Sequence, residues 1–243
     1  MVEWAADPAG GRDGDLQPWE LANERPRVAT PWPDFDNLVT LYRGKLLGLG
    51  AFKGRREAAA GLELAVHAAA NGHSAVLFAP ELPRRNPVPR LLVDRSPELT
   101  PSRLRGVLDG MAGRGEPAEL VVIDHFGLLQ PDQRLTSYDD YGDYERWDEE
   151  DGVDKAEQAA GEVARELKHL AMDHEVPIVV MAYFTGTFDK NLPLDLDRLG
   201  NAAVLEYDAD AVLLLRRLNA TQVFVRVAKD RSGPAPADAV VGW

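Results

Sequence analysis

The sequence contains no cysteine, which excludes disulfide bonds, thiolate zinc sites and cysteine nucleophiles. No apolar run approaches the ~20 residues that a membrane-spanning helix needs. The first residues also lack the basic segment and apolar run of a secretory signal. None of the five histidines belongs to an HExxH pattern, so we expect no histidine-based metal site. These absences predict a cytoplasmic protein with no membrane partner.

Basic residues are scarce, with 27 Lys and Arg against 40 Asp and Glu and a formal net charge of −13. Proteins that bind nucleic acid draw much of their affinity from Lys and Arg contacts to phosphates. The acidic balance therefore disfavours binding to free DNA, although a local basic patch would still permit it. The 243 residues, 45% of them hydrophobic, are enough for one large α/β domain.

Composition divides the chain into two parts. Residues 1–29 are rich in Gly, Pro, Asp and Glu and predict a flexible N-terminal arm, while residues 30–243 predict one core domain. Apolar runs in the core predict strands at residues 45–50, 75–79, 119–123, 177–182, 211–215 and 223–228. Amphipathic segments predict helices at residues 55–71, from a Thr100 cap onwards, and at 157–173. This alternation is typical of a doubly wound α/β fold, a mostly parallel sheet with helices on both faces.

The segment Lys45–Ala60 contains an apolar strand, a Gly-rich turn and the start of a helix, as a phosphate-binding loop does. A working loop continues after its last glycine with Lys and then Ser or Thr, but Gly54 is followed by Arg55 and Arg56. The planar fork of Arg does not fit a cradle shaped for a compact ammonium, and no hydroxyl is left to hold Mg²⁺. We therefore expect weakened binding of ATP and Mg²⁺. The candidate nucleotide-binding residues are Gly50, Lys53, Gly54, Arg55 and Arg56, with Lys53 an alternative source of charge.

Charged residues follow several of the predicted strands. The strand that ends at Asp124 has a Walker-B pattern, in which the carboxylate helps to hold Mg²⁺. Glu81 follows another buried strand and could polarise an attacking water. Lys229 and Arg231 stand two residues apart at the end of the last predicted strand, where both could reach one phosphate. Each of these patterns taken alone is also compatible with ordinary exposed charges at strand ends.

Residues 131–154 form a strongly acidic stretch with interleaved aromatic residues, including Tyr138, Tyr141, Tyr144 and Trp147. The stretch is too long and too polar for a connection inside the core. It predicts an acidic loop insertion. This loop is either a solvated segment or a recognition segment for a basic protein partner.

Taken in order, the motifs resemble those of the C-terminal RecA-like motor domain of DnaB-type replicative helicases, from about Thr30 to Trp243. The matching segments are residues 30–38, 78–82, 91–101, 122–129, 205–210 and 227–234. The resemblance implies a RecA-like P-loop NTPase core that uses ATP and Mg²⁺ and assembles with similar subunits in a ring. It begins after the arm, so we expect no counterpart of the family's N-terminal primase-binding domain.

The resemblance also implies roles for individual residues. Glu81 takes the place of the catalytic base and Asp124 that of the metal ligand. Lys229 and Arg231 match the trans-acting finger, which contacts ATP held by the neighbouring subunit. Tyr183 stands where the family has a ligand-sensing Gln. The loss of one preorganised donor typically costs about 10²–10³ in rate, so we expect slow or absent hydrolysis.

Three functions are compatible with this sequence. The first is a DnaB-like pseudo-ATPase that acts by binding partner subunits, because the cis phosphate residues are lost while the trans residues are kept. The second is an active ATP-dependent DNA helicase or translocase with an unusual P-loop. The third is a protein-interaction module in which the acidic segment 131–154 is the working part.

Overall fold

The computed structural model describes residues 27–82, 88–132, 149–189, 193–233 and 235–243. Their centre is an eight-stranded sheet with the order β10-β9-β8-β3-β7-β6-β4-β5. The strands from β8 to β5 run parallel, and β9 and β10 add an antiparallel pair at one side. The strands are β3 (Leu46–Ala51), β4 (Ala75–Phe78), β5 (Leu91–Asp94), β6 (Leu120–Ile123), β7 (Ile178–Tyr183), β8 (Ala211–Arg217), β9 (Gln222–Asp230) and β10 (Ala237–Gly242). A separate antiparallel pair is formed by β1 (Arg27–Val28) and β2 (Leu41–Tyr42).

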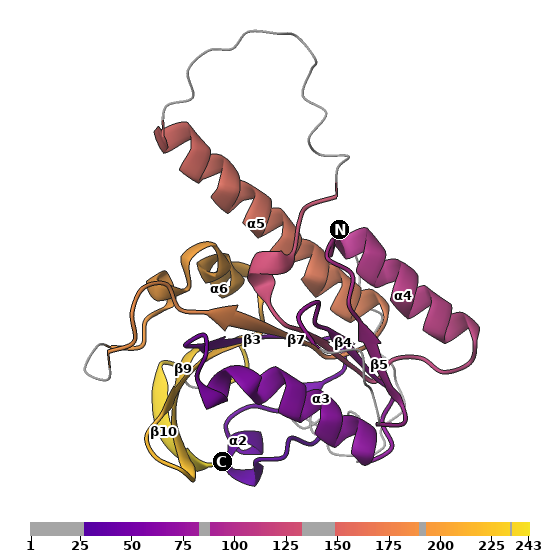
Figure 1. Cartoon of the computed structure of the whole chain (residues 1–243), viewed down its shortest axis with the longest axis horizontal. Coiled ribbons are helices and arrows are strands. Elements are labelled where there is room, and N and C mark those ends of the chain that lie inside the picture. The colour runs from indigo at the N-terminus through magenta and orange to yellow at the C-terminus, as the bar shows by residue number, and fades with distance from the viewer. Residues whose placement is uncertain (1–26, 83–87, 133–148, 190–192, 234) are drawn as a thin grey trace, which may run out of the picture.

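Helices cover both faces of this sheet, as the sequence predicts (Figure 1). One face carries α2 (Pro33–Asp36) and α3 (Ala60–Ala70), and the other carries α4 (Pro101–Gly113) and α5 (Glu149–Asp173). The shorter elements are the 3₁₀ helices η1 (Arg56–Ala59), η2 (Phe126–Leu128) and η4 (Leu196–Val204), and the helical turn α6 (Leu205–Asp208). Within the described part of the chain, no helix is both long and apolar enough to cross a membrane.

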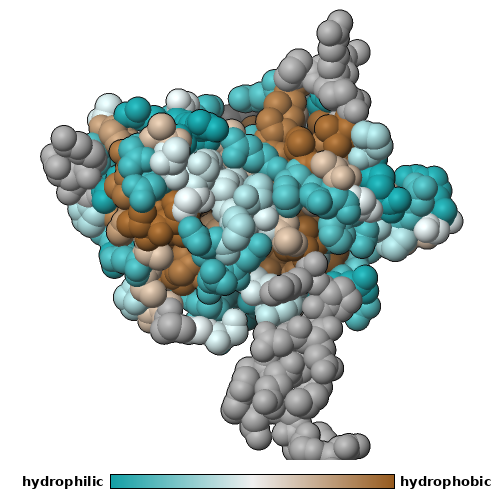
Figure 2. Space-filling model, turned by 90° about the horizontal axis from the view of Figure 1, so that it is seen from below, coloured by the Kyte–Doolittle hydropathy of each residue, from teal (hydrophilic) through white to brown (hydrophobic). Residues whose placement is uncertain are grey.

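The core consists of two hydrophobic clusters, one on each face of the sheet. Alternate residues of the central strands enter opposite clusters: in β6, Val121 and Ile123 face one cluster while Leu120 and Val122 face the other. Strands buried on both faces read as continuous apolar runs, which is why the sequence shows them clearly. On the molecular face shown in Figure 2, hydrophobic side chains reach the surface in separate areas divided by hydrophilic ones.

All six predicted strands are present, but two differences matter. The strand carrying Lys229 was predicted to be the last, and this was wrong because β10 follows it and pairs with it. The short strand β5 was not predicted, because only its first residue, Leu91, is buried. Its remaining residues therefore lack the apolar pattern of a central strand.

One predicted helix begins where the sequence places it, and another begins earlier. Thr100 caps α4 as expected, its hydroxyl accepting from the N–H of Arg103 at 3.3 Å, and Pro101 is the first helical residue. The helix α5 begins at Glu149, so the end of the predicted acidic loop 131–154 is helical, and the N-terminal end of α5 extends away from the body of the molecule (Figure 1). Residues 133–148, with most of that loop, and the arm up to residue 26 lie outside the described residues.

Candidate functional site

The parallel strands bring the predicted cis residues to one edge of the sheet. Lys53 follows β3, Glu81 follows β4, Asp124 follows β6, and Tyr183 is the last residue of β7. Because these four strands are parallel, their carboxyl ends meet at the same edge, where ligands bind in open α/β sheets. Glu81 is exposed in a turn and Asp124 is half-buried. The cis residues that the sequence predicts are therefore neighbours in space.

The carboxylate of Asp124 already has an intramolecular partner. The hydroxyl of Tyr183 donates to Asp124 Oδ1 at 2.6 Å. Burial raises the pKa of Tyr183, and the hydrogen bond to Asp124 raises it further, so the phenol keeps its proton and remains a donor. Among the described residues, no group of three or more His, Asp and Glu is placed to hold a metal ion. The predicted metal ligand therefore acts in this structure as the acceptor for a tyrosine.

His125 is a member of this site that sequence reasoning missed, although its position directly after Asp124 was a signal. Its ring lies 4.5 Å from the ring of Tyr183, and its Nδ1 accepts from the N–H of Gly127 at 3.1 Å. Burial lowers the pKa of His125, with a smaller opposing effect from Asp124, and more weakly Lys53 lowers it and Glu81 raises it. Lys53 and Glu81 are thus among the charged groups near His125.

Aromatic side chains pack against the Gly-rich turn after β3. Phe52 is 3% exposed, and its ring lies 4.7 Å from that of Phe184 and 4.9 Å from that of Phe188. The guanidinium of Arg55 stacks on Phe188 at 3.9 Å. The guanidinium of Arg198 lies 5.4 Å from the ring of Phe52. The side chain that was predicted to replace the phosphate lysine is therefore placed against an aromatic ring.

The backbone of the turn also departs from a phosphate cradle. Gly54 has φ +76°, which a glycine adopts without strain. The N–H of Arg55 is donated to the carbonyl of Phe52 at 3.2 Å instead of being available to a ligand. Arg55 itself is extended, so the predicted helix begins one residue later, as the 3₁₀ turn η1 at residues 56–59, and continues as α3 from Ala60. With no hydroxyl after Gly54 and one Asp124 oxygen engaged, these residues do not fit Mg·ATP held as in a working P-loop.

A pocket of about 410 Å³ lies beside this turn. It is formed between the turn, the segment after β7 and the end of β8. Glu57, a residue that the sequence analysis did not select, is fully buried at this place, and its Oε1 accepts from the N–H of Arg217 at 3.4 Å. The lining residues are Gly54, Arg55, Arg56, Glu57, Phe188, Arg217, Leu218 and Asn219.

Lys229 and Arg231 lie at the opposite edge of the sheet. Because β9 runs antiparallel to β8, its last residues pair with the first residues of β8. The ammonium of Lys229 donates to the carbonyl oxygens of Glu206 and Tyr207, the latter at 3.2 Å, and Arg231 donates to the same Tyr207 oxygen at 2.6 Å. Carbonyls at a helix C-terminus carry partial negative charge, so the end of α6 is a favourable place for both cations. Burial lowers the pKa of Lys229, and the charge of Arg231 lowers it further.

Asp210 connects this pair to the core. Its Oδ2 accepts from the ammonium of Lys168 at 2.7 Å and from the N–H of Leu46 at 2.8 Å. Its carbonyl accepts from the N–H of Arg231 at 2.8 Å. The backbone that carries the predicted finger is thereby fixed to the first residue of the central strand β3.

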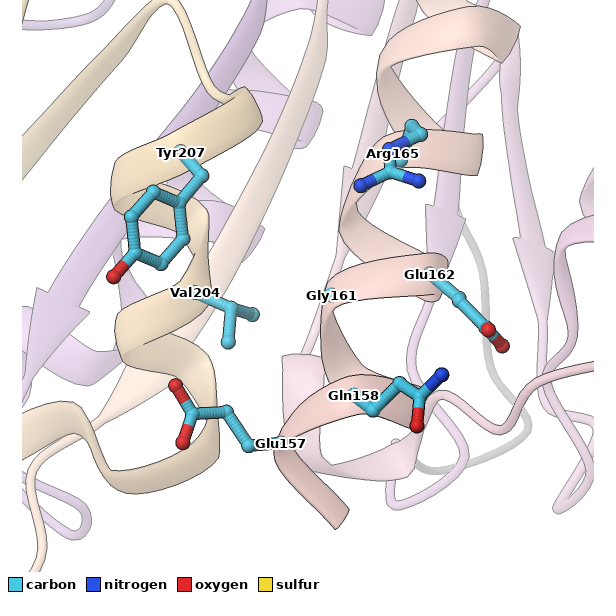
Figure 3. Close-up of a pocket in the computed structure, with 7 residues that line it drawn as sticks. All are labelled: Glu157, Gln158, Gly161, Glu162, Arg165, Val204 and Tyr207. Carbon is cyan, nitrogen blue, oxygen red and sulfur yellow. The ribbon is translucent and has the colours of Figure 1, made fainter. Parts of the chain in front are cut away.

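A second pocket, of about 490 Å³, opens next to this edge. It lies between α5, which contributes Glu157 and Arg165, and the η4–α6 segment, which contributes Val204 and Tyr207 (Figure 3). The side chain of Tyr207 is 69% exposed, although its carbonyl is bound by both cations. The predicted finger is therefore bordered by an open surface.

Similar proteins are found at the level of the family and at the level of the fold. The family model of the DnaB-like helicase C terminal domain matches residues 84–240. A DnaB-like replicative helicase, solved in a study of its interactions with primase, has a TM-score of 0.71 at 15% identity; the match covers 96% of this chain and 66% of that one. A second similar structure is an ATPase domain with a TM-score of 0.65 at 16% identity; that match covers 88% of this chain and 86% of the other.

No protein of curated function matches the sequence. The chain spans 66% of the helicase in the primase study, and at these identities the structural likeness establishes the fold. The family model covers well over half of the 243 residues. The chain therefore belongs to the family of DnaB-like helicase C-terminal domains.

Proposed function

We propose that this chain is a DnaB-like subunit that hydrolyses ATP weakly or not at all and acts by completing the nucleotide site of a neighbouring subunit. The assembly would be an oligomer with RecA-like or DnaB-like subunits, of the kind that operates in DNA replication. The observation that carries the proposal is the contrast between the two edges of the sheet. The edge with the predicted cis site lacks the Lys and the hydroxyl that bind phosphate and Mg²⁺ in a working P-loop. The edge with the predicted trans site has both of its cations.

The cis edge supports weak or absent hydrolysis. Arg55 is stacked on Phe188, and its N–H is bonded within the turn. Asp124 accepts a hydrogen bond from Tyr183 at 2.6 Å. A reacting phosphate would therefore meet neither the compact ammonium nor the metal hydroxyl of a working P-loop, each of which acts on transition-state charge.

The trans edge supports a role in a neighbour's site. Lys229 and Arg231 donate to neutral carbonyl oxygens, and the acidic residues near Lys229 offset only part of the positive charge that an anion would meet. Asp210 fixes the backbone of Arg231, which reduces the entropy lost when Arg231 binds a phosphate. The exposed Tyr207 beside them offers contact area to a second subunit.

A complementation experiment tests this proposal. The full chain is mixed with an active DnaB-type subunit whose own finger Lys and Arg have been removed, and ATP hydrolysis is measured. We expect this chain to restore hydrolysis by about 10²-fold, the typical contribution of one charge-stabilising group. The variant Arg231→Met should remove this gain.

The matched control is Arg105→Met, which removes a partly exposed arginine of α4 that pairs with Asp173 and lies far along the chain from the finger. It should restore hydrolysis as well as the unchanged chain does. The proposal fails if the mixture stays inactive, or if Arg231→Met restores hydrolysis as well as Arg105→Met does. Sedimentation of the mixtures shows whether the subunits assemble in each case.

The second candidate is an active ATPase with an unusual P-loop. It is favoured by the placement of Glu81, Asp124 and Lys53 at one edge, where Lys53 and Glu81 both influence His125. This candidate requires that the chain alone hydrolyses ATP and that Glu81→Gln and Asp124→Asn each abolish hydrolysis. Hydrolysis by the chain alone, stimulated by single-stranded DNA and lost in both variants, would establish it in place of the first.

A further inference from the structure

The end of the sheet that carries β5 has an excess of positive charge in an otherwise acidic chain. Residues 84–114, which include β5 and α4, contain seven arginines against three acidic residues, whereas the whole chain has a formal net charge of −13. In the strand order β5 stands at one end, and β9 with the predicted finger stands near the other (Figure 1). This basic surface is therefore separate from the finger.

A pocket of about 300 Å³ opens in this surface, between the start of β5 and the end of α4. Apolar side chains line part of it: Leu91 and Met111 are 7% and 6% exposed, and Leu92 is 41% exposed. Arg90 and Arg114 line the same pocket, and both are exposed. This β5–α4 pocket thus places an accessible apolar surface beside two cations.

The two arginines of the pocket have no acidic partner among the described residues. Arg103 of α4 forms an ion pair with Asp94 at 2.9 Å, but Arg90 and Arg114 form none in that part of the chain. Arg90 instead donates to the neutral hydroxyl of Ser74 at 3.2 Å. One carboxylate, that of residue 116, also lines the pocket, so the pocket keeps a net positive charge.

Such a pocket fits a peptide that carries aromatic side chains between carboxylates. Guanidinium groups bind carboxylates in bidentate pairs and stack on aromatic rings. A buried aromatic anchor with charged residues around it is a common centre of protein interfaces. A nucleic-acid backbone would pair with the arginines but would leave the apolar surface of Leu92 and Met111 without a partner.

The chain itself contains a segment of this composition. The acidic segment 131–154 has ten acidic residues against two arginines. Its aromatic residues are Tyr138, Tyr141, Tyr144 and Trp147. We propose that the acidic segment 131–154 of one chain docks in the β5–α4 pocket of a second copy. Carboxylates of the segment pair with Arg90 and Arg114, and one of its aromatic rings covers Leu92.

The lengths of α4 and α5 favour a second copy over the same chain. Asp132 accepts from the hydroxyl of Ser102 at 2.7 Å, so it lies at the start of α4, whereas the pocket lies at the end of this 13-residue helix, about 20 Å away. The segment rejoins the fold at Glu149, about 37 Å along α5 from Asp173, which contacts α4. Residues 133–148 reach about 55 Å when fully extended, so they would need nearly all of that length to visit their own pocket.

Sedimentation equilibrium of the full chain tests the proposal. We expect self-association that weakens as salt is added, because salt screens exposed charges. The double variant Arg90→Gln, Arg114→Gln should weaken this association by about tenfold or more, since both charged contacts of the interface are lost. Replacement of the four aromatic residues of the segment by serine should weaken it at least as much.

A mixture of the two variants separates docking from a general loss of association. The arginine variant keeps an intact segment and the aromatic variant keeps an intact pocket, so the mixture should associate more tightly than either variant alone. The control Arg43→Gln makes the same change in an exposed residue of the turn after β2 and should associate as the unchanged chain does. Circular dichroism melts confirm that each variant is folded.

The inference is overturned if the full chain stays monomeric, if the arginine variant associates as tightly as the unchanged chain, or if the mixture gains nothing. It is also overturned if the arginine variant loses binding to single-stranded DNA while its self-association is unchanged, because the surface would then bind nucleic acid. These measurements use this chain alone and leave the finger intact. Their outcome is therefore independent of the complementation experiment.

Discussion

The two edges of the central sheet hold their charged groups in different ways. At the edge with the Gly-rich turn, the charged groups are occupied internally: Asp124 accepts from Tyr183, and Arg55 stacks on Phe188. At the opposite edge, Lys229 and Arg231 donate to carbonyl oxygens at the end of α6, and the backbone N–H of Arg231 donates to Asp210. The fold is common to both edges, so the difference lies in a few side chains. A family assignment therefore establishes the scaffold and leaves the chemistry to be argued edge by edge.

The two edges are also stabilised by different forces. The Gly-rich turn depends on aromatic burial around Phe52. The opposite edge depends on a polar network centred on Asp210. Hydrophobic packing responds to lost volume, whereas a buried polar network responds to lost partners. Substitutions at the two edges should therefore separate stability from assembly.

The largest effect is expected for Phe52→Ala. This residue is 3% exposed and packs on two further aromatic rings, so its truncation leaves a cavity. Loss of a buried Phe typically costs about 3–5 kcal/mol of unfolding free energy. Urea denaturation followed by circular dichroism measures the change. Arg231→Met, at the opposite edge, should change stability by less than about 1 kcal/mol. Equal effects of the two variants would show that the turn is no more packed than the finger.

The next effect is expected for Asp210→Asn, which tests the network at the opposite edge. Lys168 and Asp210 are 16% and 15% exposed and lie 2.7 Å apart. Breaking a largely buried pair leaves the ammonium without its counter-charge, so we expect a loss of about 2–3 kcal/mol in urea denaturation. The variant should also weaken complementation, because Asp210 fixes the backbone of Arg231. If a destabilised Asp210→Asn chain still complements fully, the Asp210 network stabilises the fold but is not needed for Arg231 to act.

Most of the fold could be predicted from the sequence, because the central strands are buried on both faces. Runs such as Leu120–Ile123 and Ile178–Tyr183 have no polar interruption, so the sequence alone predicts them as buried strands. The strand β5 was missed because its exposed Leu92 and terminal Asp94 break the pattern. The start of α5 was placed too late because its first turns carry acidic residues, which an amphipathic pattern does not assign to a helix.

The site was less predictable, because contacts distant in sequence decide it. Glu81 and Asp124 lie together because they follow the neighbouring parallel strands β4 and β6. The predicted parallel sheet was enough to imply this. The hydrogen bond from Tyr183 to Asp124 and the stacking of Arg55 on Phe188 join residues 59 and 133 positions apart, which no local pattern encodes. Glu57 was overlooked because an acidic residue in the first turn of a helix reads as an exposed charge that favours the helix dipole.

A smaller effect of opposite sign is expected for Glu57→Gln. The substitution replaces a fully buried carboxylate, one oxygen of which lacks a partner, by a neutral amide of the same shape. We expect a gain of about 1 kcal/mol in unfolding free energy, because a neutral group costs less to bury than a charge. Thermal denaturation measures it, with Glu63→Gln as the control. A loss of stability would mean that the fold stabilises the charged form of the Glu57 carboxylate.

The smallest effect concerns His125 and the pH dependence of stability. Burial holds the pKa of His125 below its ordinary value of 6.5, so the unfolded chain binds the proton more readily than the folded one. The resulting stability is complete above about pH 6.5 and is lost as the pH falls through the lower pKa of the folded state. Because His125 is partly exposed, solvent screening keeps the change well under about 1 kcal/mol.

Urea denaturation at pH 8 and pH 5 should show a smaller pH-dependent loss for His125→Gln than for the unchanged chain. The exposed His169→Gln should behave as the unchanged chain does. If both variants lose the same stability between pH 8 and pH 5, the edge beside Asp124 is open to water. The contrast between the two edges would then depend on Arg55 and Phe52 alone.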